Sequence, residues 1–151
     1  MVVIITKIID DLEKYNITIN NIVNSAMELC ICENNEIEQI KIKLEKEIIS
    51  QLNNINVSTL IIASILLDKE GKNNNLPFNY NDDPNNLYSD EVIGMAIANE
   101  ISGTKAIFNF KWYDKKKPGI IGELDKNGFV FLDDAIAGLC AGCMSKIFSY
   151  Y

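Results

Sequence analysis

Four acidic spots in the last 62 residues of this 151-residue sequence carry the side chains best suited to chemistry. These acids are Asp90, Glu91, Asp114, Asp125, Asp133 and Asp134. Two unit charges about 4 Å apart near a protein surface repel each other by about 4 kcal/mol. Carboxylates that a fold brings together therefore need a cation between them, and the pattern predicts a metal site.

Histidine is absent from the sequence, which narrows the chemistry further. Its absence excludes phosphohistidine intermediates and Ser-His-Asp triads, and it removes the commonest metal ligand. Any catalysis must therefore use carboxylates. Oxygen ligands of this kind are preferred by a hard cation such as Mg²⁺.

The four cysteines allow a second kind of metal site. Cys30 and Cys32 form a C-x-C pair, and Cys140 and Cys143 form a C-x-x-C pair, patterns that occur in zinc and redox sites. The second pair lies in a run of small apolar residues predicted to be helical, without the βαβ setting of a redox motif. Cysteine in such a run behaves as a small hydrophobe, so core packing is the favoured interpretation.

Charge and hydropathy limit the partners. The formal net charge of -7 argues against nucleic acid, which requires a basic stripe. The longest apolar stretch, residues 57–67, is shorter than the roughly 20 residues that span a bilayer, and the N-terminus lacks signal-peptide features. We therefore expect a cytoplasmic protein with no integral membrane span. The mean hydropathy of +0.03 is compatible with a homodimer that buries a helix face.

Apolar residues recur with a helical period along most of the chain, and little of it alternates as a strand would. Helices are predicted over residues 2–15, 18–32, 35–51, 56–69, 88–102, 104–115 and 132–148, with a short helical turn over 119–125. The length is that of one ordinary domain. We expect a single all-α domain over residues 1–151, with the apolar helix 56–69 either central or sandwiched between other helices.

Local signals mark the helix starts and one long loop. Thr18 is predicted to cap the second helix, and Asn35 with Glu38 resembles a capping arrangement for the third. Residues 71–86 are rich in Asn, Asp and Pro, and they form a predicted loop that leads directly to Asp90.

Two of the acidic spots are pairs of adjacent residues, Asp90-Glu91 and Asp133-Asp134, and each pair lies in the first turn of a predicted helix. At this position an acid has a role simpler than metal binding. An acid at this position caps the helix and interacts favourably with its dipole. One cap needs only one side chain, however, and adjacent residues point about 100° apart on a helix. One acid of each pair can therefore cap while its neighbour faces a shared cleft.

The run from Asp114 to Gly119 combines a carboxylate, three lysines and a proline turn. Lys117 could bind a phosphate oxygen while Asp114 holds a metal, or the run could be an ordinary exposed helix end with basic residues. Composition favours neither interpretation.

Four aromatic residues that precede or begin this part of the chain could line a ring-binding pocket, but core packing is the favoured interpretation. They are Phe108, Phe110, Trp112 and Tyr113.

Three segments in this region resemble the three motifs of the phosphatidylglycerophosphatase A superfamily. They are LYSDEVIG at residues 87–94, YDKKKPGIIGELD at 113–125 and FLDDAIAG at 131–138. Their order and spacing match as well. Within the superfamily the chain is most similar to the soluble, all-helical branch that includes YutG-like proteins and the archaeal α-ribazole phosphatase.

The resemblance implies a Mg²⁺-dependent phosphomonoesterase built from about six helices around a central apolar helix. By position, it implies metal binding by Asp90, Glu91, Asp133 and Asp134, catalysis by Asp114, Asp125 and Asp134, and substrate binding by Lys117 and Lys111. Lys111 stands where the membrane phosphatases usually carry an arginine. Whether water or an aspartate is the nucleophile stays open.

Three functions remain after the resemblance is considered. The membrane members carry a Gly/Ser/Pro-rich N-terminal motif and membrane spans that this sequence does not show. A small phosphorylated substrate is therefore favoured, namely α-ribazole 5'-phosphate of cobalamin biosynthesis. Phosphatidylglycerophosphate is the alternative substrate. The third hypothesis is a non-catalytic helical interaction module whose acids only cap helices.

Overall fold

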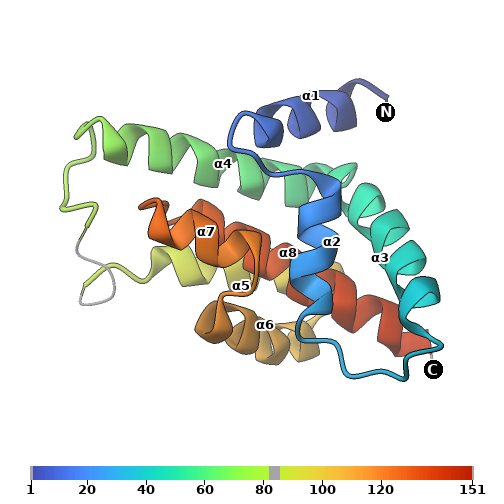
Figure 1. Ribbon diagram of the computed structural model, residues 1–151. Coiled ribbons are helices and arrows are strands. Elements are labelled where there is room, and N and C mark those ends of the chain that lie inside the picture. Colours follow the sequence, from blue (N-terminus) through green and yellow to red (C-terminus); the bar gives the residue numbers. More distant parts are fainter. Residues whose placement is uncertain (1, 82–85, 151) are drawn as a thin grey trace.

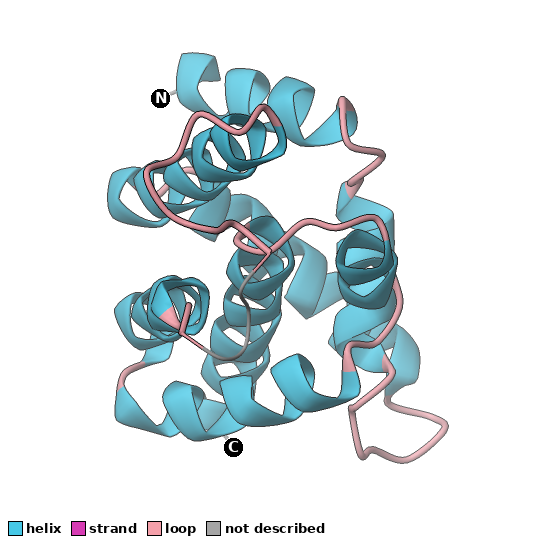
Figure 2. Ribbon diagram, turned by 90° about the vertical axis from the view of Figure 1, so that its left-hand side faces the viewer, coloured by secondary structure: helices cyan, strands magenta, loops and turns pink. Residues whose placement is uncertain are grey.

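The computed structural model describes residues 2–81 and 86–150, and its regular structure is entirely helical (Figure 1). The helices are α1 (Val2–Glu13), α2 (Ile19–Met27), α3 (Ile37–Leu52), α4 (Ile55–Lys72), α5 (Ser89–Ser102), α6 (Thr104–Lys116), α7 (Ile120–Lys126), α8 (Leu132–Ile147) and the short 3₁₀-helix η1 (Phe148–Tyr150). Figure 2 shows only helices and loops in these residues, so the all-α prediction is confirmed.

The helical periodicity located most elements closely. It predicted seven helices and a short helical turn, and the described residues form eight α-helices, more than the six or so that the resemblance implied. The largest error in a boundary is at α2, which ends at Met27 rather than near Cys32. Part of the predicted loop over 71–86, namely residues 82–85, lies outside the described residues.

The two predicted caps had different outcomes. Thr18 caps α2 in a capping box: its Oγ1 accepts from the Asn21 backbone N–H at 3.2 Å, and the Asn21 side chain accepts from the Thr18 N–H at 2.8 Å. The Asn35–Glu38 prediction is wrong, because the cap residue of α3 is Glu36 and it makes no side-chain capping bond. The same helix buries Ile40, Leu44 and Ile48, which lie on one of its faces.

The central helix is α8. Every residue from Leu132 to Met144 is buried, and α8 contacts each helix from α2 to α7. The prediction that the helix over 56–69 is central is wrong, because α4 exposes Ile55, Ile62 and Leu66 on its outer side. Alanine, glycine and cysteine make much of α8 thin enough for other helices to pack around it.

Glycines hold α5 and α8 in close contact. A Cβ atom at Gly138 would lie 2.2 Å from the carbonyl oxygen of Gly94, and a Cβ atom at Gly94 would lie 2.7 Å from that of Asp134. These neighbours are backbone atoms, so no side-chain rotation could make room. The first turns of α5 and α8 are therefore side by side, and both acidic pairs lie there.

Helix α6 divides its aromatic residues between the core and the surface. Phe110 and Tyr113 are buried, as the favoured interpretation expected. Phe108 and Trp112 are 72% and 52% exposed, so core packing is wrong for these two. They lie on the side of α6 that turns away from α8.

A search of the described residues for membrane-spanning segments finds no individual helix with sufficient length and hydropathy. Helices α3 and α4 meet these two criteria as a pair, and the pair is bent by 80° at the break between them.

Candidate functional site

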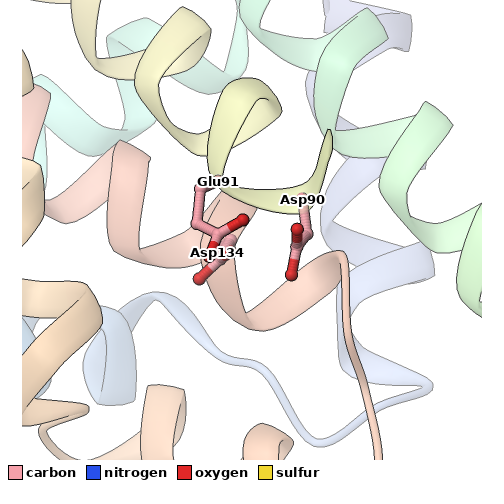
Figure 3. Close-up of side chains that lie close together, drawn as sticks. All are labelled: Asp90, Glu91 and Asp134. Carbon is pink, nitrogen blue, oxygen red and sulfur yellow. The ribbon is translucent and has the colours of Figure 1, made fainter. Parts of the chain in front are cut away.

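The first turns of α5 and α8 bring three carboxylates together. The side chains of Asp90, Glu91 and Asp134 each offer an oxygen atom, and these oxygens all lie within 4.8 Å of one another (Figure 3). Asp90 and Asp134 are each only 2% exposed, while Glu91 is half-buried. Oxygens that share one Mg²⁺ ion lie about 3–4 Å apart, so small side-chain movements would complete a coordination shell.

The hydrogen bonding of this group fits a cation. Oε2 of Glu91 and Oδ1 of Asp134 are buried without a hydrogen-bond partner among the described residues. A buried carboxylate that is only partly compensated costs several kcal/mol, and either a proton or a divalent cation would supply the compensation. The donor set contains only carboxylate oxygens, which suit a hard ion such as Mg²⁺ better than a thiophilic one.

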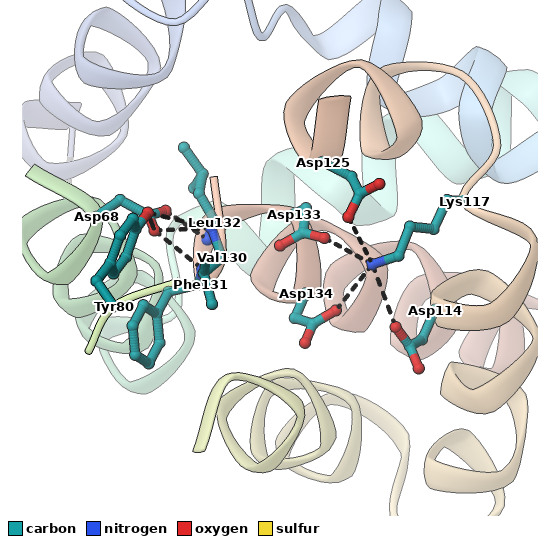
Figure 4. A network of polar contacts seen from close by, with 10 residues as sticks. All are labelled: Asp68, Tyr80, Asp114, Lys117, Asp125, Val130, Phe131, Leu132, Asp133 and Asp134. Atoms are coloured by element: carbon teal, nitrogen blue, oxygen red, sulfur yellow. Dashed lines mark hydrogen bonds and ion pairs between the residues drawn. The ribbon is translucent and has the colours of Figure 1, made fainter. Parts of the chain in front are cut away.

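A second group of contacts surrounds the ammonium of Lys117, which ends α6 in the left-handed conformation with φ 45°. Its Nζ atom lies 2.7 Å from Oδ2 of Asp133, 3.4 Å from Oδ1 of Asp114, 3.6 Å from Oδ1 of Asp125 and 3.8 Å from Oδ1 of Asp134 (Figure 4). Only the contact with Asp133 has the length of a strong charge-assisted hydrogen bond. Asp134 belongs to both groups, so the two groups form one site.

The electrostatics of the site follow from burial. Burial raises the pKa of Asp133 to about 7, although Lys117 lowers it in part. Burial and, after it, the charge of Asp133 together raise the pKa of Asp134 to about 10. Burial acts to lower the pKa of Lys117, but Asp133 and Asp134 outweigh it and hold that pKa above its ordinary value. One lysine therefore does not balance the buried negative charge.

Asp68 of α4 supplies the hydrogen-bond acceptors for the backbone N–H groups at the N-terminus of α8. Its Oδ1 accepts hydrogen bonds from the backbone N–H groups of Val130 at 2.9 Å and Phe131 at 3.0 Å, and its Oδ2 accepts from Leu132 at 2.7 Å (Figure 4). The hydroxyl of Tyr80 donates to the same carboxylate at 2.5 Å. Asp68 is fully buried. It therefore holds the turn from which Asp133 and Asp134 project.

This arrangement shows that neither Asp133 nor Asp134 is needed to cap α8. The cap residue, Phe131, makes no side-chain capping bond, and Asp68 satisfies the N–H groups instead. The side chain of Asp133 contacts Lys117, and the side chain of Asp134 lies beside Asp90 and Glu91 of α5. Sequence reasoning missed Asp68. The available signal was an acid placed directly after the apolar run of residues 57–67.

The remaining predicted residues lie farther out. The side chains of Asp114 and Asp125 are 32% and 49% exposed, so they form the open side of the site. Lys111 lies on the exposed side of α6 and takes part in none of the ion pairs found among the described residues. The structure thus brings together every predicted site residue except Lys111.

The cysteines lie apart from these carboxylates. Cys140 and Cys143 are fully buried in α8, and all four cysteines are free thiols. Burial raises the pKa of Cys140 to about 12, so the thiol is protonated and behaves as a small apolar side chain of the core.

Fold and site define an all-helical protein with a carboxylate-rich site that fits a divalent cation. The chain matches the family described as phosphatidylglycerophosphatase A over residues 13–149, and it belongs to that family. The resemblance seen in the three motifs is thereby confirmed. Family membership indicates phosphatase chemistry.

Relatives of known structure share the fold. The structure of protein YpjQ from Bacillus subtilis is similar with a TM-score of 0.79 and 26% identity, covering 97% of this chain and 94% of that one. The low temperature requirement C protein from Listeria monocytogenes has the same fold, with a TM-score of 0.82, 24% identity, and coverage of 98% and 96%.

A closer match in sequence is the uncharacterized protein MJ1330 of Methanocaldococcus jannaschii. It is 68% identical over 125 residues, which are 83% of this chain and 98% of that protein. The similarity therefore covers nearly the whole of that relative.

Proposed function

We propose that this chain is a Mg²⁺-dependent phosphomonoester hydrolase. The observation that carries the proposal is one site in which three carboxylates, with oxygens within 4.8 Å of one another, adjoin a lysine surrounded by four acids. Phosphate ester hydrolysis is chiefly a problem of positioning charge. Such a site offers both oxygen ligands for a cation and a fixed positive group, the ammonium of Lys117.

Asp90, Glu91 and Asp134 would hold the ion, with Asp133 beside them. When bound, the ion neutralises phosphoryl oxygens and orients the attacking group. Lys117 keeps its short bond to Asp133, which fixes the ammonium in place. Its longer contacts, at 3.4–3.8 Å, are weak enough to be exchanged for a hydrogen bond to a phosphoryl oxygen.

Asp114 and Asp125 supply the remaining chemistry on the open side of the site. In one route a carboxylate takes a proton from water, and the resulting hydroxide attacks phosphorus as the ester oxygen leaves with a proton. In the other, an aspartate attacks and water then cleaves the acyl phosphate. Hydrolysis of a substrate made chiral at phosphorus with oxygen isotopes distinguishes them, because one in-line displacement inverts the configuration and two successive displacements retain it.

For the substrate we propose α-ribazole 5'-phosphate, which a cytoplasmic enzyme would meet in free form. The family's description favours a second candidate, phosphatidylglycerophosphate. Phosphate release from each compound, measured with Mg²⁺ and with a chelator, tests both the reaction and the choice. Release from neither compound, nor from a broad panel of phosphate monoesters, would reject the proposed function.

A further inference from the structure

The outer side of α6 carries a surface that the hydrolase proposal does not use. We call it the α6 basic–aromatic face, and it consists of Lys105, Phe108, Lys111, Trp112, Lys115 and Lys116. All six residues are exposed, and every charge among them is positive. The acid of this helix, Asp114, lies outside the face and pairs with Lys117.

The six side chains are ordered across the face. With 3.6 residues per turn, Phe108 and Trp112 lie about 40° apart along the middle of the outer side. Lys111 and Lys115 flank them on one edge, and Lys105 and Lys116 flank them on the other. Figure 1 shows α6 along the lower edge of the molecule.

Three of the four lysines of this face are available to a partner, whereas Lys105 donates a hydrogen bond to Ser149. Lys111, Lys115 and Lys116 take part in none of the ion pairs of the described residues, whereas the next residue, Lys117, contacts four carboxylates. The chain as a whole carries a net charge of -7, so this face opposes the overall charge. A concentration of exposed aromatic and basic residues on one helix is typical of an interaction surface.

We propose that the α6 basic–aromatic face docks on the surface of an anionic phospholipid membrane. Aromatic rings lie favourably at the level of lipid headgroups, while flanking lysines extend towards lipid phosphates. A second copy of the chain fits less well, because a two-fold contact through α6 would bring two sets of four lysines together. Membrane docking requires no catalysis, so the docking proposal can be tested independently of the proposed hydrolase activity.

Trp112 allows a direct test, because it is the one tryptophan in the sequence. Vesicles of equal parts phosphatidylglycerol and phosphatidylcholine should shift its emission to shorter wavelengths, and lipids brominated near the headgroup should quench it. Vesicles of phosphatidylcholine alone should do neither. The effect should disappear at about 1 M salt, where the screening length is about 3 Å.

Two triple variants of equal net charge separate local from overall electrostatics. Lys111→Gln/Lys115→Gln/Lys116→Gln should weaken partitioning about 100-fold, at about fivefold for each lysine. The control, Lys7→Gln/Lys46→Gln/Lys126→Gln, removes three exposed lysines from α1, α3 and α7 and should retain binding. Phe108→Ser should reduce binding without changing the charge.

Several outcomes would overturn the docking proposal. They are failure to sediment with the anionic vesicles at low salt, equal binding to vesicles of phosphatidylcholine alone, and equal losses in the two triple variants. A Trp112 shift that grows with protein concentration without lipid would identify a contact between copies instead. An equal shift with single-stranded DNA would identify a nucleic-acid surface.

Discussion

At the scale of single residues, Asp134 is the point where the two halves of the site meet. Its carboxylate belongs to the group formed with Asp90 and Glu91, and it also lies 3.8 Å from the ammonium of Lys117. Burial, together with the charge of Asp133, raises its pKa to about 10. In the metal-free protein it is therefore protonated at neutral pH, and a cation would displace that proton.

Asp134→Asn should abolish metal-dependent activity while leaving the fold intact. Asparagine has nearly the shape of a protonated aspartate, so the metal-free melting temperature should change little. Loss of a charged ligand should lower kcat/KM by about 10²–10³-fold, measured as Mg²⁺-dependent phosphate release. Asp10→Asn, at an exposed position of α1, is the matched control. Full activity in Asp134→Asn would remove that residue from the site.

At the scale of secondary-structure elements, α8 depends on α4 and on the loop after it. The start of α8 receives its hydrogen-bond acceptor from Asp68, 64 residues away in the sequence. The hydroxyl of Tyr80 donates a hydrogen bond to the same carboxylate. Burial and the neighbouring Asp68 raise the pKa of Tyr80, so its hydroxyl stays a donor. The position of the site acids is therefore set by three segments and not by α8 alone.

Tyr80→Phe should lower the free energy of unfolding by about 1 kcal/mol, because the buried carboxylate loses one donor. Chemical denaturation measures this change. Tyr88→Phe is the matched control, since Tyr88 is 71% exposed and should change stability by less than about 0.5 kcal/mol. Equal effects of the two substitutions would show that the Asp68–Tyr80 bond contributes nothing to the fold.

At the scale of the whole molecule, the fold gathers negative charge at one place and exposes positive charge at another. The pKa of Asp133 is raised to about 7 and that of Asp134 to about 10, both chiefly by burial and both above the ordinary value of 3.8. Their stabilising contribution to the metal-free fold is thus fully present below about pH 4. It is lost as the pH rises through 7 for Asp133 and through 10 for Asp134.

Mg²⁺ should therefore stabilise the protein more at pH 8 than at pH 5, where protons compete for the same oxygens. At a concentration about 100 times the dissociation constant, binding contributes about 2.7 kcal/mol. For a domain of this size that corresponds to a rise in melting temperature of about 5–10 °C at pH 8. Thermal unfolding with and without Mg²⁺ measures it. A non-catalytic module whose acids only cap helices predicts no rise at either pH.

The sequence by itself determined the helices, the acidic motifs and the family. Helical period and caps such as Thr18 depend on residues three or four positions apart, and the motifs are contiguous, so neighbours along the chain carry this information. Only the tertiary structure decided that α8 is central, that Asp68 supports it and that Lys117 lies among four acids. It also decided that Trp112 faces outwards. Each of these facts depends on which distant segments approach one another, and burial and buried charge arise only from that approach.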